Sequence, residues 1–412
     1  MISKFTELYQ ENQNEQKLRY ESLAKDFAEL FGNADNIKFF SAPGRTEVGG
    51  NHTDHQHGRV LAAAVNLDII AAAVKRDDNV IVLKSKEYSK IDEVDISNLD
   101  VVDAEREKSA SLIRGICAGC VNRGYKVGGF NAYTVSSVLK GSGLSSSAAF
   151  EVLVTTIINH FYNNGEIDAV TVAQISQYAE NVYFGKPSGL MDQTASSVGG
   201  FTAIDFNDPK APVLEKIGFD LTKYGYNLCI VDTKGNHADL TNEYASIPVE
   251  MKTVAAYYGK EVLRDVDEKA VYADLKILRE KYGDRAVLRA LHFFDDNRRA
   301  KEEADALKAG DFETFKNIVI ASGRSSLMKL QNVFASSAPQ EQGLTMALAV
   351  TEKILEGKGA YRVHGGGFAG TIQAYVPNEL LDEYKSAIEA VFGEGACYVL
   401  SIRSAGGTKV EF

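Results

Sequence analysis

The chain has 412 residues, of which 45% are hydrophobic and 25% are charged, and its formal net charge is −11 at pH 7. This length predicts two or three domains, and the composition is ordinary for a globular enzyme. The negative charge disfavours nucleic acid and anionic membranes as partners. The N-terminus lacks an apolar signal core, and the most apolar run, residues 60–74, is shorter than the roughly 20 residues that span a bilayer. We therefore expect a cytoplasmic protein, with a monomer as the expected state and a dimer left open.

The first half of the chain mixes strand and helix patterns. The predicted elements, in chain order, are a helix over 15–31, strands over 37–41, 60–75 and 80–85, a helix over 105–123, a strand over 130–138, and helices over 148–162 and 168–182. Within the helix over 105–123, Cys117 and Cys120 have the spacing of a redox or metal pair. Apolar neighbours favour buried thiols instead, and no disulfide is expected.

Beyond residue 210 long helical patterns predominate. The predicted elements are a strand over 226–232, helices over 250–257, 269–282, 285–308, 312–333 and 340–356, and a strand over 371–376. The chain has no internal repeat and no regular βαβ alternation, which favours the α+β class over a doubly wound sheet. Asn207-Asp208-Pro209 breaks the pattern. We therefore predict an N-terminal domain over 1–210 and a C-terminal domain over 211–412.

A glycine-serine loop at 140–149, Lys-Gly-Ser-Gly-Leu-Ser-Ser-Ser-Ala-Ala, separates a predicted strand from a predicted helix. Glycine lets the backbone approach a bulky anion, and the N-terminus of the following helix attracts phosphate. The serine hydroxyls also suit magnesium. The same sequence is compatible with a plain turn that has a serine N-cap, so the loop alone leaves phosphate binding and a structural turn both open. The chain has neither a Gly-x-x-x-x-Gly-Lys-Ser/Thr loop nor the protein-kinase signature set.

Three other segments carry polar residues in unusual density. Residues 42–58 hold three histidines and an aspartate among glycines, which fits a metal site, a sugar-binding loop or a solvated turn. Glu180 ends a predicted helix and suits magnesium. Asp192 lies in a glycine-rich turn, where burial would raise its pKa and a nearby arginine would lower it. The alternative is that Asp192 only caps the next segment. The late loop at 362–370, Arg-Val-His-Gly-Gly-Gly-Phe-Ala-Gly, would close over a phosphate, pack against the serine loop or form a flexible hairpin.

Taken together and in this order, these motifs resemble the galactokinases of the GHMP small-molecule kinase superfamily. The strong matches are Ala-Pro-Gly-Arg with His-Thr-Asp at 42–54, Gly-x-Gly-Leu-Ser-Ser-Ser-Ala at 141–148 and Gly-Leu-Met-Asp-Gln at 189–193; weaker ones are Asn-Glu-Tyr at 242–244 and the loop at 365–370. The resemblance implies two α+β domains with the active site in the cleft between them. It also implies ATP-dependent phosphorylation of the anomeric hydroxyl of galactose.

The resemblance assigns roles to particular residues. Arg45 and Asp192 are expected to be catalytic, with Asp192 accepting the hydroxyl proton, or playing a more modest role because phosphoryl transfer needs little base help. Mg²⁺ is expected at Ser147 and Glu180. The phosphates of ATP are expected against Gly141, Ser142, Gly143, Leu144, Ser145, Ser146 and Ser147. The sugar hydroxyls are expected to contact Asn51, His52, Asp54, Gly189 and Tyr244.

The chain departs from the family pattern in four places. Gly-Asn-His-Thr-Asp-His at 50–55 replaces the usual Gly-Glu-His-Thr-Asp-Tyr. A neutral Asn51 removes a charge that would repel a C6 carboxylate, so galacturonic acid is an alternative substrate, with galactose the default. Thr46-Glu47 stands where Val-Asn is usual, and His364 stands where threonine is usual. Ser-Ile-Pro at 246–248 replaces an arginine pair, which puts the substrate contacts there in doubt.

A non-catalytic sensor of galactose and ATP is the alternative from another functional class. Such a protein is expected to have a damaged phosphate loop, with larger residues after the serines. Residues 145–149 are all serine or alanine, and Arg45 and Asp192 are both present. The sequence therefore favours the enzyme.

Overall fold

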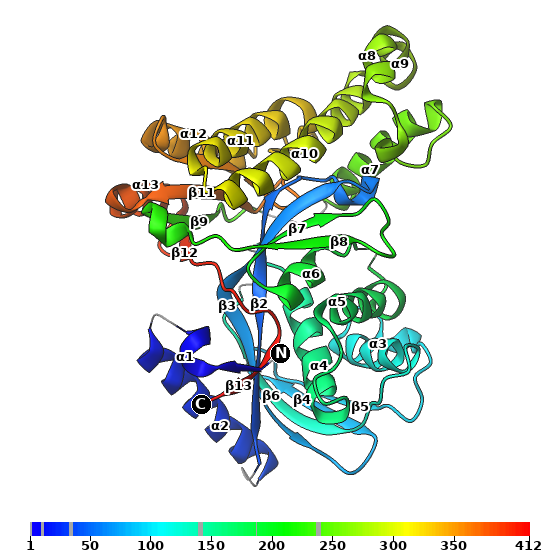
Figure 1. Ribbon diagram of the computed structural model, residues 1–412, viewed down its shortest axis with the longest axis vertical. Coiled ribbons are helices and arrows are strands. Elements are labelled where there is room, and N and C mark those ends of the chain that lie inside the picture. Colours follow the sequence, from blue (N-terminus) through cyan, green and yellow to red (C-terminus); the bar gives the residue numbers. More distant parts are fainter. Residues whose placement is uncertain (1, 10–11, 33–35, 139–142, 187, 236–239) are drawn as a thin grey trace.

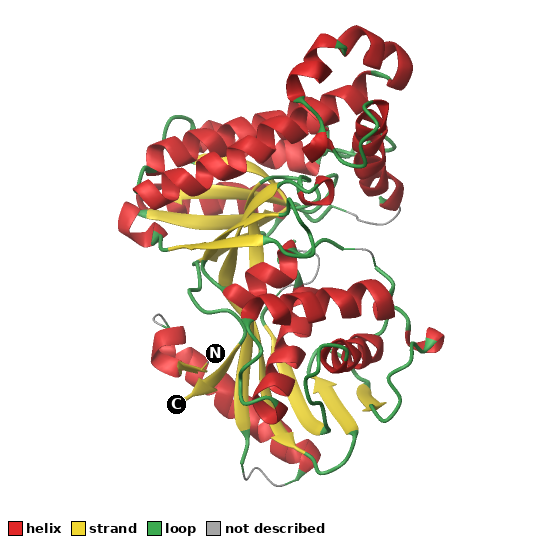
Figure 2. Cartoon of the chain, turned by 45° about the vertical axis from the view of Figure 1, so that its right-hand side comes forward, coloured by secondary structure: helices red, strands yellow, loops and turns green. Residues whose placement is uncertain are grey.

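The computed structural model describes residues 2–9, 12–32, 36–138, 143–186, 188–235 and 240–412. It contains a nine-stranded sheet and a four-stranded sheet, each covered by helices (Figures 1 and 2). No helix within these ranges combines the length and the apolar character needed to cross a bilayer. Gly141 and Ser142, which are expected to contact phosphate, lie outside the described ranges.

The larger sheet has the strand order β1-β13-β2-β3-β6-β4-β5, and β7 and β8 extend it from β3. Its strands are β1 (Ile2–Lys4), β2 (Lys38–Gly49), β3 (Arg59–Lys75), β4 (Val80–Ser85), β5 (Ile91–Asp95), β6 (Phe130–Ser136), β7 (Phe201–Asp205), β8 (Val213–Ile217) and β13 (Thr408–Glu411). The first and last strands pair in parallel, so both ends of the chain lie together (Figure 1).

Helices cover both faces of this sheet (Figure 1). One face carries α2 (Gln13–Phe31), after the short α1 (Phe5–Leu8). The other face carries α3 (Ser109–Val121), α4 (Ser146–Tyr162), α5 (Ala169–Tyr178) and α6 (Met191–Val198). The aliphatic side chains of β2, β3, α3 and α4 form the main buried core between them.

The smaller sheet has the order β10-β11-β9-β12 and is antiparallel throughout. Its strands are β9 (Tyr226–Asp232), β10 (Ala360–His364), β11 (Thr371–Pro377) and β12 (Cys397–Leu400). The helices of this half are α7 (Thr241–Tyr257), α8 (Glu268–Ala273), α9 (Leu275–Tyr282), α10 (Asp284–Ala309), α11 (Phe312–Ser325), α12 (Gly343–Leu355) and α13 (Leu381–Phe392). The pair α8 and α9 forms the outer corner in Figure 1.

A buried carboxylate ties distant parts of the chain to the larger sheet. Asp68 on β3 has no exposed surface, and it accepts hydrogen bonds from Arg19 on α2 at 2.5 Å and from Arg403 at 2.9 Å. The hydroxyls of Ser41 and Tyr9 also donate to it at 2.5 Å. Two guanidinium groups outweigh the effect of burial and lower the pKa of Asp68.

Most predicted elements are confirmed, and the differences have local causes. The strand expected to end at 41 continues to Gly49, because register shifts beside Pro43 and Glu47 let β2 keep pairing with β3. The helix expected over 168–182 ends at Tyr178 and continues as a π-helical turn (Ala179–Phe184). The expected helix over 269–282 divides at Asp274. Cys117 and Cys120 are buried free thiols, as expected, and so are Cys229 and Cys397.

The division at residue 210 remains a prediction. β8 and β13 lie beyond that residue in the sequence, yet they pair with β7 and β2 of the larger sheet. The larger sheet is therefore built from both predicted domains.

Candidate active site

The candidate site lies where β2, the start of α4 and the start of α6 meet. Arg45 follows the register shift in β2, and Asp192 lies in the first turn of α6. The Arg45 Nε donates to Asp192 Oδ1 at 2.6 Å, although the two residues are 147 positions apart. Their side chains are 8% and 29% exposed, so the carboxylate is the more accessible partner. The fold thus brings together the two residues expected to be catalytic.

The surroundings of Asp192 keep it ionised. Burial disfavours its charged form, but Arg45 and the hydroxyl of Ser145, which donates to Asp192 Oδ2 at 2.5 Å, outweigh burial and lower the pKa of Asp192. Of the two effects considered from the sequence, the nearby arginine therefore prevails. An ionised carboxylate accepts hydrogen bonds, and its lowered pKa makes it a weak base.

Arg45 also holds the glycine-serine loop expected to bind phosphate. Its backbone N–H donates to the Leu144 carbonyl at 3.0 Å, and its Nη1 donates to the Gly143 carbonyl. Gly143 has a φ of +70°, and a Cβ there would lie 3.0 Å from the Nδ1 of His364 and 2.9 Å from the hydroxyl of Thr371. Only glycine fits this position without strain.

The start of α4 offers backbone N–H groups to an anion. Ser145 occupies the N-cap with a φ of 54°, but its side chain turns to Asp192, and no side chain of the described residues caps the helix there. The first turn, with Ser146 and Ser147, therefore keeps donors and a positive dipole end for a ligand. This geometry favours the phosphate-loop interpretation over a plain serine-capped turn.

Glu180, the expected metal ligand, lies at the centre of a polar cluster. It is on the π-helical turn and only 4% exposed. Its Oε1 accepts from Lys186 Nζ at 2.8 Å, and its Oε2 accepts from Gln193 Nε2 at 2.9 Å and from the Ser188 hydroxyl. The carboxylate is thus fixed by its neighbours and faces the loop that leads to α6.

A second carboxylate in this cluster was missed in the sequence. Glu151 Oε2 accepts from Gln193 Nε2 at 3.0 Å, so one amide bridges Glu151 and Glu180. Burial and the charge of Glu180 raise the pKa of Glu151 well above its usual range, and its Oε1 has no partner among the described residues. Glu151 lies four residues after Ser147, on the same helix face, and this spacing was the available signal. The described residues contain no group of three His, Cys, Asp or Glu side chains poised around a metal ion.

Two of the expected sugar-binding residues, Asp54 and Gly189, lie against each other. Asp54 begins a short 3₁₀ turn (Asp54–Gln56), and a Cβ on Gly189 would lie 2.3 Å from Asp54 Oδ2. Burial raises the pKa of Asp54, and the nearby charge of Asp192 adds to this effect. The two carboxylates therefore share one small region beside Arg45, which also interacts electrostatically with Asp54.

His52 and Tyr244 contact the late glycine loop. The His52 Nε2 lies 3.0 Å from the Gly366 carbonyl, and the Tyr244 hydroxyl donates to the Gly367 carbonyl at 3.0 Å. At the start of this loop, the buried His364 bonds to Thr371 and packs against Gly143. The late loop is therefore packed against the glycine-serine loop, which was one of the three arrangements expected for it.

Asn51 is a correction to the expected sugar contacts. It is fully buried, and its amide donates to Glu47 Oε1 at 2.8 Å and to the Gly365 carbonyl at 2.7 Å. Its Oδ1 accepts from Asn332 Nδ2 at 2.9 Å. The side chain serves the protein interior in this structure and presents no surface to a sugar.

The negative charge expected to be lost at position 51 is displaced, because Glu47 lies beside Asn51. The family pattern has asparagine at the position of Glu47 and glutamate at the position of Asn51, so the two residue types are exchanged in this chain. Glu47 Oε1 also accepts from Arg362 Nη2 at 2.9 Å, and both side chains are buried. A carboxylate therefore remains beside position 51, and no loss of negative charge there favours a uronic acid.

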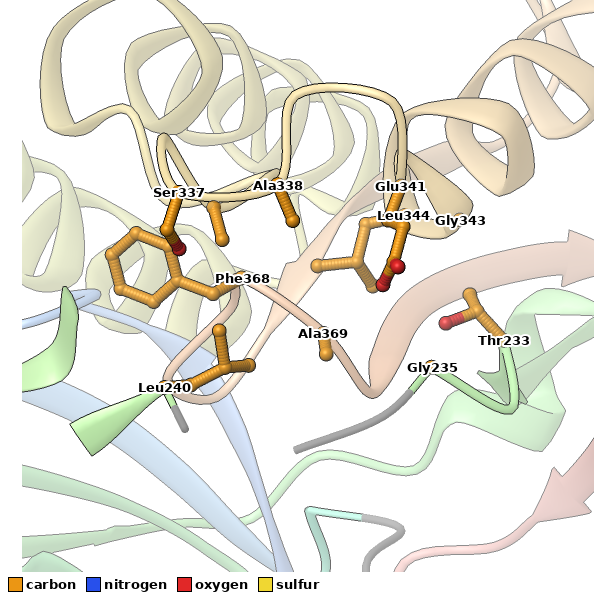
Figure 3. Close-up of a pocket in the computed structure, with 11 residues that line it drawn as sticks. Thr233, Gly235, Leu240, Ser337, Ala338, Glu341, Gly343, Leu344, Phe368 and Ala369 are labelled. Atoms are coloured by element: carbon orange, nitrogen blue, oxygen red, sulfur yellow. The ribbon is translucent and has the colours of Figure 1, made fainter. Parts of the chain in front are cut away.

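Figure 3 shows a separate cavity of about 320 Å³ beside the late loop. Phe368 and Leu240 line one part of it, Thr233 follows β9, and Glu341 and Leu344 come from the start of α12 and the turn before it. The cavity adjoins the late loop, but its lining does not include the arginine–aspartate pair.

Comparisons with known proteins agree with this geometry. A galactokinase galactose-binding signature matches residues 25–75, and a GHMP kinase N-terminal domain matches residues 111–200. The chain is 31% identical over 373 residues to a galactokinase of Streptomyces coelicolor, covering 90% of this chain and 92% of that protein.

Solved structures show the same fold. A Lactococcus lactis galactokinase complexed with galactose superimposes with a TM-score of 0.81 at 24% identity, over 95% of this chain and 100% of that one. A Methanococcus jannaschii mevalonate kinase matches with a TM-score of 0.63 at 14% identity, over 89% and 99% of the two chains. With the identity to the Streptomyces protein extending over nearly all of both sequences, the chain belongs to the galactokinase family of GHMP kinases.

Proposed function

We propose that this protein is a galactose 1-kinase, which transfers the γ-phosphoryl group of ATP to the anomeric hydroxyl of galactose. The products are galactose 1-phosphate, ADP and a proton. Membership of the galactokinase family supports the sugar and the nucleotide. The observation that carries the chemistry is the 2.6 Å contact between Arg45 and Asp192 beside the uncapped start of α4.

Asp192 is proposed to orient the anomeric hydroxyl and to receive its proton. The oxygen of that hydroxyl forms the new bond to the γ-phosphorus while the bond from phosphorus to the ADP oxygen breaks. Because its pKa is lowered, Asp192 is a weak base, and its proton uptake belongs late in the step, after the hydroxyl has begun to bond to phosphorus. A loose phosphoryl-transfer transition state needs little more than this.

Arg45 and the start of α4 are proposed to stabilise negative charge. Arg45 contacts the carboxylate of Asp192 and the backbone carbonyl of Gly143 at the same time. The carboxylate that orients the sugar hydroxyl and the proposed phosphate loop are therefore fixed relative to each other. The backbone N–H groups of the first turn of α4, which no described side chain caps, lie in the same region and would attract phosphate oxygens. Fixed donors of this kind need no rearrangement during the reaction.

Mg²⁺ is proposed to bind through Glu180 and Ser147. Both are oxygen donors, and Glu151 Oε1 is a further buried oxygen without a partner among the described residues. Magnesium usually takes one or two protein ligands and completes its shell with phosphates and water, so this sparse oxygen set fits it. When bound, Mg²⁺ would neutralise charge on the phosphates.

The sugar is proposed to lie between Asp54, Gly189, His52 and Tyr244. The carboxylate of Asp54 would accept hydrogen bonds from sugar hydroxyls, and the absence of a side chain at Gly189 lets that carboxylate lie against the loop. Galactose remains the favoured sugar over galacturonate, because the family match supports galactose and the carboxylate of Glu47 beside Asn51 removes the charge-based reason for a uronic acid. ATP use also supports the expected cytoplasmic location.

A coupled ADP assay on the purified protein tests this proposal. With ATP and Mg²⁺, we expect ADP formation that depends on galactose, and ³¹P NMR should identify the product as a sugar 1-phosphate. Galacturonate, arabinose, glucose and N-acetylgalactosamine serve as comparison sugars. Faster turnover of galacturonate would overturn the choice of substrate, and binding of galactose and ATP without turnover would favour the sensor.

A further inference from the structure

Lys186 places a positive charge directly on the proposed metal ligand. Its Nζ is 2.8 Å from Glu180 Oε1, and its backbone N–H donates to the Glu180 carbonyl at 3.1 Å. The loop turns at Gly185, which has a φ of +92° and allows residue 186 to fold back on the end of the π-helical turn. One backbone contact thus holds residue 186 against Glu180, and one side-chain contact places the ammonium at the carboxylate.

The two partners of this ion pair differ in their freedom to move. The Lys186 side chain is 57% exposed, whereas that of Glu180 is 4% exposed and is also held by Gln193 and Ser188. Lysine carries its charge on a flexible four-carbon chain. When the pair separates, the lysine therefore moves and the glutamate stays.

The pair lies at the edge of the phosphate site. Through Gln193, Glu180 is joined to Glu151, one turn along α4 from Ser147. The charge of Lys186 also acts favourably on Asp192 and Glu151. With nucleotide bound, an ammonium released from Glu180 would find phosphate oxygens among the charged acceptors of this region.

We propose that Lys186 is a further nucleotide-binding residue, which neutralises Glu180 before nucleotide binds and transfers to the phosphates when metal-bound ATP arrives. This inference rests on the proposed function. A divalent ion and an ammonium compete for the same carboxylate oxygen, because both are cations and the oxygen is buried. The departing ammonium then gains a charge-assisted hydrogen bond to a phosphate oxygen.

Opposite effects on metal and on nucleotide distinguish this exchange from a structural ion pair. In Lys186→Met, we expect Mn²⁺ to bind the nucleotide-free protein about two- to fivefold more tightly, because the competing ammonium is gone; the effect is modest because that ammonium is half-exposed. We expect the Kd for metal-bound ATP to rise about tenfold, from the loss of one charged hydrogen bond. Electron paramagnetic resonance measures the first and calorimetry the second.

Two further variants complete the experiment. Lys186→Arg keeps the charge and should bind metal-bound ATP within about threefold of the parent. Lys223→Met removes a lysine that is 78% exposed on a distant turn and should change neither affinity. Unchanged affinities in Lys186→Met, or a weaker affinity for both ligands, would overturn the inference. Should Lys186→Met fail to fold in a thermal melt, Lys186→Gln provides the same comparison.

The proposed function is judged separately. Galactose-dependent ADP formation by the parent protein decides it, whatever Lys186 does. If the parent is active and the two affinities do not move in opposite directions, only the inference about Lys186 fails.

Discussion

Replacing Asp192 by asparagine tests the central contact of the proposed site. The substitution preserves shape but removes the charge that Arg45, only 8% exposed, is paired with at 2.6 Å. One amide oxygen still accepts a hydrogen bond, so the loss is that of a charged interaction rather than of all contacts. Because Asp192 is partly exposed, water compensates in part, and we expect a stability loss of about 1–3 kcal/mol.

The effect on catalysis should be larger than the effect on stability. A positioned acid–base group contributes about 10²–10⁴-fold to rate, and Asp192 both orients the hydroxyl and receives its proton. We therefore expect kcat to fall by at least about a hundredfold in the coupled ADP assay. The KM for ATP should change little, since the donors for phosphate at the start of α4 remain.

The matched control is Asp305→Asn, which removes a half-exposed carboxylate from α10 far from the site. Urea unfolding of both variants separates folding from chemistry. A kcat for Asp192→Asn within tenfold of the parent, with the fold intact, would refute the assignment of Arg45 and Asp192 as the catalytic pair.

Further expectations concern the buried polar residues behind the site. Glu47→Gln should lower the free energy of unfolding by about 2–4 kcal/mol in urea, because it leaves the buried Arg362 without this carboxylate. The double variant Glu47→Asn, Asn51→Glu restores the family order and should recover part of that loss. Asn51→Glu alone sets two carboxylates side by side and should be the least stable. Gly143→Ala should weaken ATP binding in calorimetry, since its φ of +70° and the adjacent His364 leave no room for a methyl group; a normal affinity would contradict this packing. Burial lowers the pKa of His364 well below 6.5, so this histidine stays neutral in the folded protein, whereas in the unfolded chain it takes up a proton as the pH falls. Between pH 7.5 and 5.5 the parent should therefore lose about 1.4 kcal/mol more stability than His364→Gln. Equal losses would show that His364 is protonated within the folded protein.

The elements with strong periodicity were predictable from the sequence, and so was the grouping of the site motifs. The helix over 285–308 and the strands over 60–75 and 80–85 match α10, β3 and β4 within two residues. Their signals are local, because long apolar stripes and runs fix the element wherever it packs. The approach of Arg45 to Asp192 followed from the order of family motifs rather than from any local pattern.

The contacts that decide the environment of Asn51 were not predictable. They depend on Glu47, on Arg362 and on Asn332, and the last two lie more than 280 residues away in the sequence. No spacing rule relates such positions, and a polar residue in a glycine-rich loop looks the same whether it meets a sugar or another strand. The second carboxylate, Glu151, was within reach, since its helical offset from Ser147 places it on the same face.

The Asp68 cluster has a consequence for how this protein can be divided. Arg19 and Arg403, which compensate one buried charge on β3, come from opposite ends of the polypeptide. A gene fragment ending at residue 210 would encode a chain that keeps Asp68 and Arg19 but lacks Arg403. It would also lack β13, the strand that pairs with β2. We expect such a fragment to be insoluble when expressed alone, and to become soluble on co-expression with the remainder of the polypeptide.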